Sequence, residues 1–138
     1  RYVNQGYSRD ELFGIYRASK VGLVTPLRDG MNLVAKEYVA AQDPADPGVL
    51  VLSCFAGAAA QLKEAVIVNP HSAEDIADGI ARALAMPLAE RQGRHKAMLE
   101  CITRQDVNWW SQTFMEALAE VPGPDSRPQL IEAGGGKA

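Results

Sequence analysis

Short apolar runs alternate with amphipathic segments along most of the chain. Continuous apolar runs are typical of strands buried on both faces of a parallel sheet, and they lie at 21–25, 49–52 and 65–68. Apolar residues at helical spacing predict helices over about 9–19 and 33–42, and the Gly/Ala-rich stretch 56–62 predicts a short helix. This alternation predicts βαβ units, and therefore an α/β fold with a Rossmann-like parallel sheet and flanking helices.

Capping residues mark several of the expected helix starts. Ser8 stands three residues before Glu11, which is the spacing of a capping box, and Ser72 with Asp75 opens a helix after the third apolar run. Beyond it the pattern is helical only, over about 87–104 and then from Asp106, which caps a helix rich in aromatic residues. The Pro- and Gly-rich stretch 122–138 predicts a flexible tail, so we expect one folded domain over 1–121.

Composition narrows the class of protein. With 138 residues, 47% of them hydrophobic and 22% charged, the chain has the size and balance of one globular domain rather than of a disordered or fibrous protein. The net charge is −3 and no basic run exceeds two adjacent residues, which disfavours nucleic acid as a partner. No apolar stretch approaches the roughly 20 residues of a membrane span. We therefore expect a cytoplasmic protein without a membrane partner.

The cysteines and histidines offer little sign of chemistry. Cys54 and Cys101 are far apart, show no CxxC or Cys/His ligand spacing and have apolar neighbours, so we expect buried, reduced thiols. His71 and His95 each stand alone, without a second ligand or a catalytic partner at a useful spacing. We expect no metal site and assign neither histidine a role.

The loop after the first strand carries the most promising chemistry. In open parallel sheets, ligands bind outside the carboxyl ends of the strands, here the segments 5–9, 25–33 and 53–58. In the second of these, Gly30 permits a positive φ, and Asn32 is a good N-cap for a helix that begins at Leu33. The free amides of residues 33–35, with the helix dipole, would then form an anion site that suits a phosphate or diphosphate.

Two carboxylates accompany this anion site. Glu37 lies one turn into the helix, and helical side chains lean toward the N-terminus, so its carboxylate can reach the mouth of the site and accept both hydroxyls of a ribose. Asp29 lies on the loop, where a carboxylate can accept hydrogen bonds from sugar hydroxyls. The same residues also fit a plain connection with a first-turn glutamate, and the pattern alone leaves both interpretations open.

A family resemblance favours the binding interpretation. The segments that carry it are LVTPLRDGMNLVAKEYVAAQ, VLVLSCFAGAAAQL, AVIVNP and DVNWW, and the likeness runs from about residue 2 to 118. Together they resemble the C-terminal nucleotide-sugar domain of the trehalose-6-phosphate synthase family, retaining glucosyltransferases of GT-B architecture. The resemblance implies a role in trehalose biosynthesis: transfer of glucose from UDP-glucose to glucose 6-phosphate, which gives trehalose 6-phosphate and UDP, with no cofactor.

The resemblance also implies a donor site, residue by residue. The candidate UDP-glucose-binding residues are Tyr7, Leu12, Asp29, Gly30, Met31, Asn32, Leu33, Val34, Ala35, Lys36 and Glu37. Among them, Asp29 would bind the glucose hydroxyls and is the candidate catalytic residue. The amides of Leu33 and Val34 would hold the diphosphate, and Glu37 would bind the ribose, which agrees with the argument from the helix terminus.

The remaining candidates differ in how far the residues support them. The backbone of residues 30–32 would contact the glucosyl group, and Leu12 would pack near the uracil. Tyr7 would lie beside the uracil, although ordinary packing at a helix start explains a loop aromatic equally well. Arg28 and Lys36 do not match the cations with which the family clamps the diphosphate, so we expect surface or helix-face positions for both.

We therefore expect this chain to be a fragment that holds part of the donor site. The cationic clamp would precede its first residue, and glucose 6-phosphate would bind through a missing N-terminal domain, so the fragment alone would be inactive. A homo-oligomer is possible. Two alternatives stay open: a sister nucleotide-sugar glycosyltransferase with another acceptor, and a non-catalytic regulatory or scaffolding domain.

Overall fold

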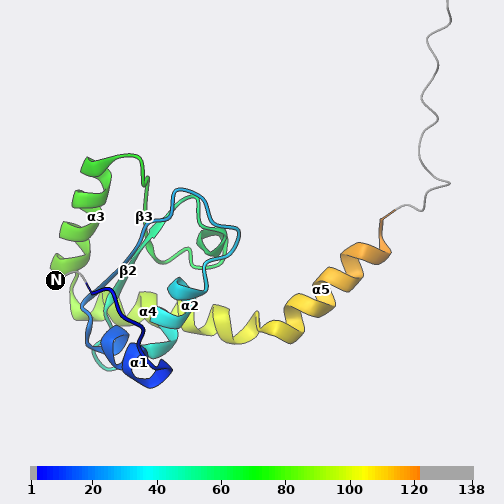
Figure 1. The fold of residues 1–138 in the computed structure, drawn as a ribbon, viewed down its shortest axis with the longest axis horizontal. Coiled ribbons are helices and arrows are strands. Elements are labelled where there is room, and N and C mark those ends of the chain that lie inside the picture. The colour runs from blue at the N-terminus through cyan, green and yellow to red at the C-terminus, as the bar shows by residue number, and fades with distance from the viewer. Residues whose placement is uncertain (1–2, 122–138) are drawn as a thin grey trace, which may run out of the picture. The chain divides into compact units, whose positions relative to one another are not determined.

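The computed structural model describes residues 3–121, and these residues form an α/β fold around a parallel sheet. The strands β1 (Val21–Val24), β2 (Val49–Ser53) and β3 (Val66–Val68) pair in the order β1-β2-β3. The helices are α1 (Arg9–Ala18), α2 (Leu33–Ala41), the 3₁₀ turn η1 (Gly57–Ala60), α3 (Ala73–Ala85), α4 (Leu88–Arg104) and α5 (Val107–Ala119) (Figure 1). The predicted fold class is confirmed, and so is each predicted strand and helix within these residues.

The helix starts follow from their capping residues. The Ser8 hydroxyl accepts a hydrogen bond from the Glu11 amide, and the Glu11 carboxylate accepts one from the Ser8 amide at 2.9 Å, which completes the predicted capping box. These bonds lower the pKa of Glu11. Ser72 caps α3, and Asp106 caps α5 by accepting from two amides of its first turn.

Each face of the sheet packs against its own helices. On one face, Leu50 and Leu52 of β2 pack with residues of α2 and α4, including the buried Val39 and Met98. On the opposite face, α3 covers Val51 and its neighbours on β2 and β3 (Figure 1). The alternation of side chains along a strand places successive β2 residues on opposite faces, so both layers of the core share this strand.

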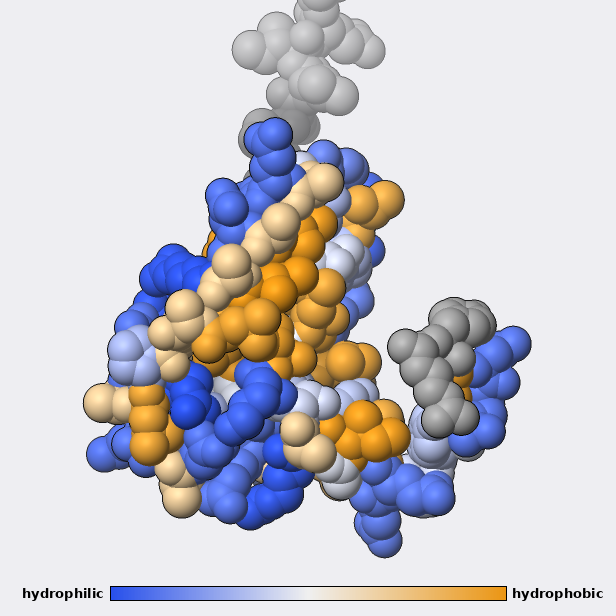
Figure 2. Space-filling model, turned by 90° about the vertical axis from the view of Figure 1, so that its left-hand side faces the viewer, coloured by the Kyte–Doolittle hydropathy of each residue, from blue (hydrophilic) through white to orange (hydrophobic). Residues whose placement is uncertain are grey.

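Burial differs between the strands, although their sequences look alike. All residues of β2 are buried, as the continuous apolar run predicts. The prediction is wrong for the flanking strands: Leu23 of β1 is 47% exposed and Ile67 of β3 is 41% exposed. The reason is their position on either side of β2, where the described helices cover them only in part. Figure 2 shows a band of apolar surface between hydrophilic margins on one face of the molecule.

The chain separates into two compact units between Arg104 and Gln105. The first holds the sheet, and the second holds α5, whose large apolar side chains are exposed: Val107, Trp109, Trp110, Phe114, Met115 and Leu118. The predicted tail over 122–138 lies outside the described residues, and a single domain over 1–121 stays a prediction. Among the described helices, none combines the length and the apolar character that crossing a membrane requires.

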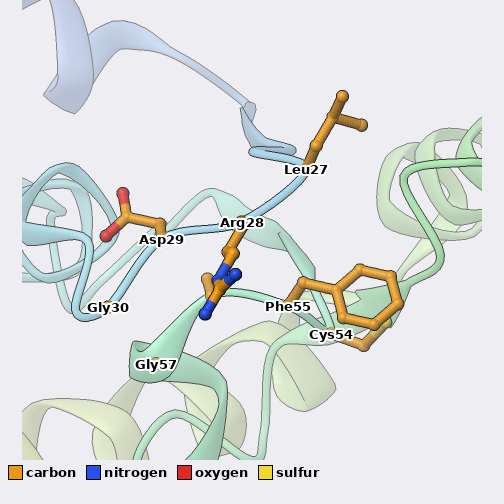
Figure 3. A pocket seen from close by; sticks show the side chains of 8 residues that line it. Leu27, Arg28, Asp29, Gly30, Cys54, Phe55 and Gly57 are labelled. Atoms are coloured by element: carbon orange, nitrogen blue, oxygen red, sulfur yellow. The ribbon is translucent and has the colours of Figure 1, made fainter.

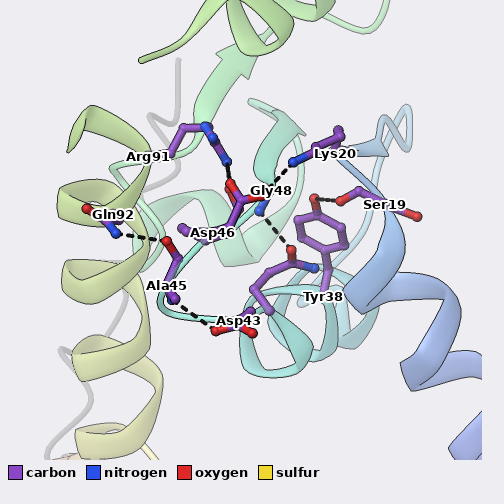
Figure 4. Close-up of polar contacts among 11 residues, drawn as sticks. Ser19, Lys20, Tyr38, Asp43, Ala45, Asp46, Gly48, Arg91 and Gln92 are labelled. Carbon is purple, nitrogen blue, oxygen red and sulfur yellow. Dashed lines mark hydrogen bonds and ion pairs between the residues drawn. The ribbon is translucent and has the colours of Figure 1, made fainter. Parts of the chain in front are cut away.

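A polar cluster lies at the amino ends of β1 and β2 (Figure 4). It consists of Ser19, Lys20, Tyr38, Gln42, Asp46, Gly48 and Arg91. The buried Gln42 amide group donates to Tyr16 O at 2.7 Å and accepts from Gly48 N at 2.8 Å, and Tyr38 Oη donates to Ser19 O at 2.9 Å. Asp46 pairs with Lys20 and Arg91, each at 2.7 Å. This cluster ties α2 and α4 to the segments that lead into the strands.

Candidate functional site

A cavity of about 410 Å³ lies at the opposite end of the sheet, where β1 and β2 end. The loop after β1 and the loop after β2 form its walls, so two of the three predicted segments meet there (Figure 3). The lining residues are Leu27, Arg28, Asp29, Gly30, Cys54, Phe55, Ala56 and Gly57. Tyr7 and Leu12, from the first predicted segment, are not among them.

Backbone hydrogen bonds join the two loops. Asp29 N donates to Phe55 O at 3.2 Å, Gly57 N donates to Asp29 O at 2.9 Å, and Ala58 N donates to Met31 O at 2.6 Å. Asp29 and Ala56 thereby form a parallel bridge outside the main sheet. We call these three hydrogen bonds the clasp. The clasp fixes the loop after β1 against the next loop along the sheet, independently of the side chains of either loop.

The Asp29 carboxylate shapes its own loop. Oδ1 accepts from Met31 N at 2.9 Å, and Oδ2 accepts from Asn32 Nδ2 at 3.0 Å. The bond from the Met31 amide, followed by that from Asn32, lowers the pKa of Asp29 and keeps it charged. Each carboxylate oxygen has a further lone pair, so the predicted contacts to sugar hydroxyls are compatible with both bonds. Its side chain points away from that of Arg28 (Figure 3).

Asn32 is the left-handed residue of this loop. Its φ is 75°, and no glycine within residues 3–121 has a positive φ, so the prediction for Gly30 is wrong. Asparagine tolerates this region because its short side chain bonds nearby groups, and here it bonds both Asp29 and Ala35. Backbone strain of this kind gathers at ligand sites.

The amide groups at the start of α2 are only partly free. Asn32 Oδ1 accepts from Ala35 N at 2.9 Å, which confirms the predicted N-cap but contradicts a free amide at Ala35. The Ala35 side chain is also fully buried. Within residues 3–121 no partner is recorded for the amides of Leu33 and Val34, both of which belong to exposed residues. The predicted anion site is therefore reduced from three free amides to two, at the positive end of α2.

Three further predicted residues lie on or before the helices. Glu37 and Lys36 are half-buried on α2. Glu37 lies near enough to Tyr16 of α1 for its charge to raise the pKa of that phenol, although burial is the larger cause. Tyr7 is exposed before α1, as an aromatic residue that meets a ligand would be.

Comparisons with known proteins identify the family. The profile of glycosyltransferase family 20 matches residues 1–120. The chain belongs to this family. The trehalose-6-phosphate synthase of Citrobacter koseri is 61% identical over 120 residues, which are 87% of this chain and 25% of that protein. The chain thus spans about a quarter of the length of the curated relatives it matches.

Solved structures of trehalose-6-phosphate synthases are similar to this chain in both sequence and fold. An E. coli trehalose-6-phosphate structure bound with UDP-2-fluoro glucose is 58% identical, with a TM-score of 0.81, over 88% of this chain and 27% of that one. An α,α-trehalose-phosphate synthase (UDP-forming) from Burkholderia xenovorans in complex with glucose-6-phosphate is 55% identical, with a TM-score of 0.81, over 86% and 26%. At these identities the family 20 fold of this chain is established.

Several residues of this family 20 chain lie where the sequence did not predict them. Cys54 is exposed at the cavity and Cys101 is half-buried, so the prediction of buried thiols is wrong, although neither forms a disulfide within the described residues. The reason for Cys54 is that β2 ends at Ser53, one residue earlier. Arg28 is exposed, as predicted, and it also lines the cavity. Its position next to Asp29 in the sequence is the feature from which its place at the cavity could be predicted.

The histidines have structural neighbours. His71 contacts the Phe55 ring edge-on, with centroids 5.6 Å apart, and the buried His95 lies with Nε2 3.1 Å from Val39 O. Within the described part of the chain, no three side chains of His, Cys, Asp or Glu lie close enough together to hold a metal ion.

Proposed function

We propose that this chain is the donor-binding part of a trehalose-6-phosphate synthase, which transfers glucose from UDP-glucose to glucose 6-phosphate. The observation that carries the proposal is the junction of the loop after β1 with α2. There the open amides of Leu33 and Val34 lie four to five residues after the charged Asp29. The similar E. coli structure bound with UDP-2-fluoro glucose supports this donor, and the Burkholderia xenovorans structure in complex with glucose-6-phosphate supports the acceptor.

Each part of the donor finds a matching group at this junction. The diphosphate accepts hydrogen bonds from the amides of Leu33 and Val34, with the dipole of α2 behind them. The Glu37 carboxylate accepts from the ribose hydroxyls, one helical turn further on. Asp29 accepts from the glucose hydroxyls and, with the backbone of 30–32, orients the glucosyl group.

The uracil lies at the start of α1. Tyr7 offers an exposed aromatic face beside the base, and Leu12 offers apolar contact from the first turns of the helix. The donor thereby extends from α1 across the start of α2 to the cavity. For Ala35 and Lys36, which lie between the diphosphate-binding amides and Glu37, we assign no specific contact with the donor. The Ala35 amide already donates to Asn32.

Glucosyl transfer breaks the bond from the anomeric carbon to the diphosphate oxygen and forms a bond from that carbon to the acceptor oxygen, which loses its proton. Negative charge therefore builds on the departing UDP. The amides of Leu33 and Val34 stabilise that charge because they are already oriented before the reaction. The charged Asp29 holds the sugar and stabilises positive charge on its ring. The acceptor site and the family's cationic clamp lie in the other part of such an enzyme, so the 138-residue chain alone should bind donor without turnover.

Calorimetric titration of the 138-residue chain with UDP, and then with UDP-glucose, at low salt tests the donor site. We expect weak, saturable binding that Glu37→Ala abolishes, because the ribose contact is lost. Glu100→Ala is the matched control, since Glu100 is an exposed glutamate on α4. Binding that survives Glu37→Ala unchanged would overturn the assignment of Glu37.

A chimera tests the activity itself. Residues 3–121 replace the corresponding segment of the Citrobacter koseri relative, and UDP-glucose-dependent formation of trehalose 6-phosphate is measured. We expect activity within about tenfold of the parent, because the family geometry is retained. A folded chimera without activity would contradict the proposal and would favour a non-catalytic role for the chain.

A further inference from the structure

Gly57 lies where the two loops of the cavity touch. A Cβ atom built at this position would collide with Gly30 O, and it would lie 2.7 Å from Gly30 C and 3.2 Å from Met31 N. Every neighbour in this set is a backbone atom, so no side-chain rotation can relieve the collision. The close approach of the two loops therefore requires glycine at position 57.

This approach is what closes the clasp. The Gly57 amide donates to Asp29 O, and the next amide, that of Ala58, donates to Met31 O. These two bonds flank Gly30, the residue that a Cβ atom at position 57 would push away. Displacing Gly30 would therefore break the clasp and release the loop that carries Asp29 and Met31.

We propose that Gly57 is a positioning residue for the glucosyl half of the donor site, an inference that rests on the proposed function. Gly57 lies on the cavity wall, and its effect on the donor passes through the backbone of residues 29–31. The loop after β2 thus sets the geometry of the loop after β1. A misplacement of about 1 Å at reacting groups can cost a hundredfold in rate.

Glu37, the residue proposed to bind the nucleotide, is held in place by core packing rather than by the clasp. Glu37 belongs to α2, and the neighbouring residues Ala35, Tyr38 and Val39 are each at most 3% exposed in the core. Core packing therefore holds the Glu37 backbone whether or not the clasp is closed. The two halves should respond separately to a substitution at position 57: glucosyl transfer should fall while UDP affinity is retained.

The test compares Gly57→Ala with the unmodified chimera described above. We expect kcat/KM for UDP-glucose to fall roughly tenfold to a hundredfold, chiefly through kcat, while inhibition by UDP keeps its constant. Gly79→Ala is the matched control, because its Cβ atom would lie 2.6 Å from Val68 Cγ1 in the core beneath α3, away from the cavity. That variant should lower Tm without the same split between kcat and UDP affinity.

A second measurement, on the unmodified chain, tests the inference even if Gly57→Ala fails to fold. Hydrogen exchange in the unmodified 138-residue chain should show the amides of Gly57 and Ala58 protected to the same degree as those of β2, because the clasp bonds them. Free exchange at these amides, or an unchanged kcat/KM in Gly57→Ala, overturns the inference. An inactive unmodified chimera with a protected clasp instead overturns the proposed function and leaves the positioning of the loop by Gly57 intact.

Discussion

The two ends of the sheet are built from different kinds of polar contact. At the amino end, the polar cluster joins segments that are far apart in sequence, such as Arg91 with Asp46, 45 residues away. In the loop after β1, at the carboxyl end, side-chain bonds stay within three residues: Asp29 with Met31 and Asn32, and Asn32 with Ala35. At the amino end, side chains connect distant segments, whereas in the loop after β1 they shape that loop, and the backbone hydrogen bonds of the clasp join it to the next loop.

The two ends of the sheet also differ in how deeply their residues are buried. Gln42 and Tyr38, in the amino-end cluster, are 4% and 3% exposed, and burial raises the pKa of Tyr38 to about 12. At the carboxyl end, Leu33 is 59% exposed and Val34 is 44% exposed. Buried polar groups stabilise a fold only when each is bonded, whereas open groups are free for a ligand. The contacts that stabilise the fold and the proposed donor site therefore lie at opposite ends of the sheet, and variants should separate their effects.

The largest expected effect comes from Gly48→Ala in the amino-end cluster. A Cβ atom here would collide with Tyr38 Oη, and it would lie 2.5 Å from Ser19 O and 2.9 Å from Gln42 Oε1. We expect a loss of about 3 kcal/mol of unfolding free energy, because overpacking adds to broken buried hydrogen bonds. Urea denaturation followed by circular dichroism measures it.

Gly93→Ala is the control for that measurement. Gly93 lies within α4, and beyond the adjoining backbone of that helix no described atom lies within 4 Å of its added Cβ. Alanine should stabilise the helix by about 0.5–1 kcal/mol. If Gly48→Ala were as stable as Gly93→Ala, the amino-end cluster would not be the rigid part of the molecule.

A smaller effect on stability, with a larger effect on binding, is expected for Asn32→Ala. Alanine loses the cap to Ala35 N and must adopt the positive φ, which together cost about 2 kcal/mol. Asn32→Gly loses the same bonds but adopts this φ freely. The expected order of stability is Asn, then Gly, then Ala, and both variants should weaken the titration with UDP-glucose. Equal stability of the two variants would show that the backbone strain is negligible.

Much of the fold follows from local sequence patterns. Capping residues such as Ser8, Ser72 and Asp106 fix helix starts through bonds to amides two or three residues away, so the sequence alone suffices to place them. The exposure of Leu23 does not follow from local pattern, because β1 and β2 are both continuous apolar runs. Which of them is central depends on strand order, which only the tertiary structure sets.

The candidate site likewise has features that follow from local sequence and features that depend on the tertiary structure. The open amides of Leu33 and Val34 could be predicted because an N-cap before a helix implies free amides in the first turn, and their role as an anion site stays a prediction. The sequence favours Gly30 as the left-handed residue, since glycine adopts positive φ most readily, yet Asn32 takes this conformation and makes two side-chain bonds there. Nothing in the sequence indicates the need for Gly57, because the atoms that exclude a Cβ belong to a loop 27 residues earlier.

The smallest expected effect concerns Asp46, the exposed carboxylate of the amino-end cluster. Bonds from Lys20 and then Arg91 lower its pKa, so it binds protons less readily in the folded state than in the unfolded state. Its contribution to stability is therefore fully present above the unfolded pKa of about 3.9 and is lost as the pH falls through the lower folded value. Asp46→Asn should be less stable than the unmodified chain near neutral pH, and the difference should narrow below about pH 4.

Urea midpoints across this pH range, at low and high salt, measure that difference. Asp78→Asn is the matched control, since Asp78 is exposed on α3 and no ion pair is recorded for it among the described residues. Salt should shrink the effect of Asp46→Asn because exposed charges are screened. The same titration should leave binding of UDP at the carboxyl end unchanged between the variants. If Asp46→Asn weakened UDP binding, the two ends would be coupled through the sheet, and the separation of stability from binding would fail.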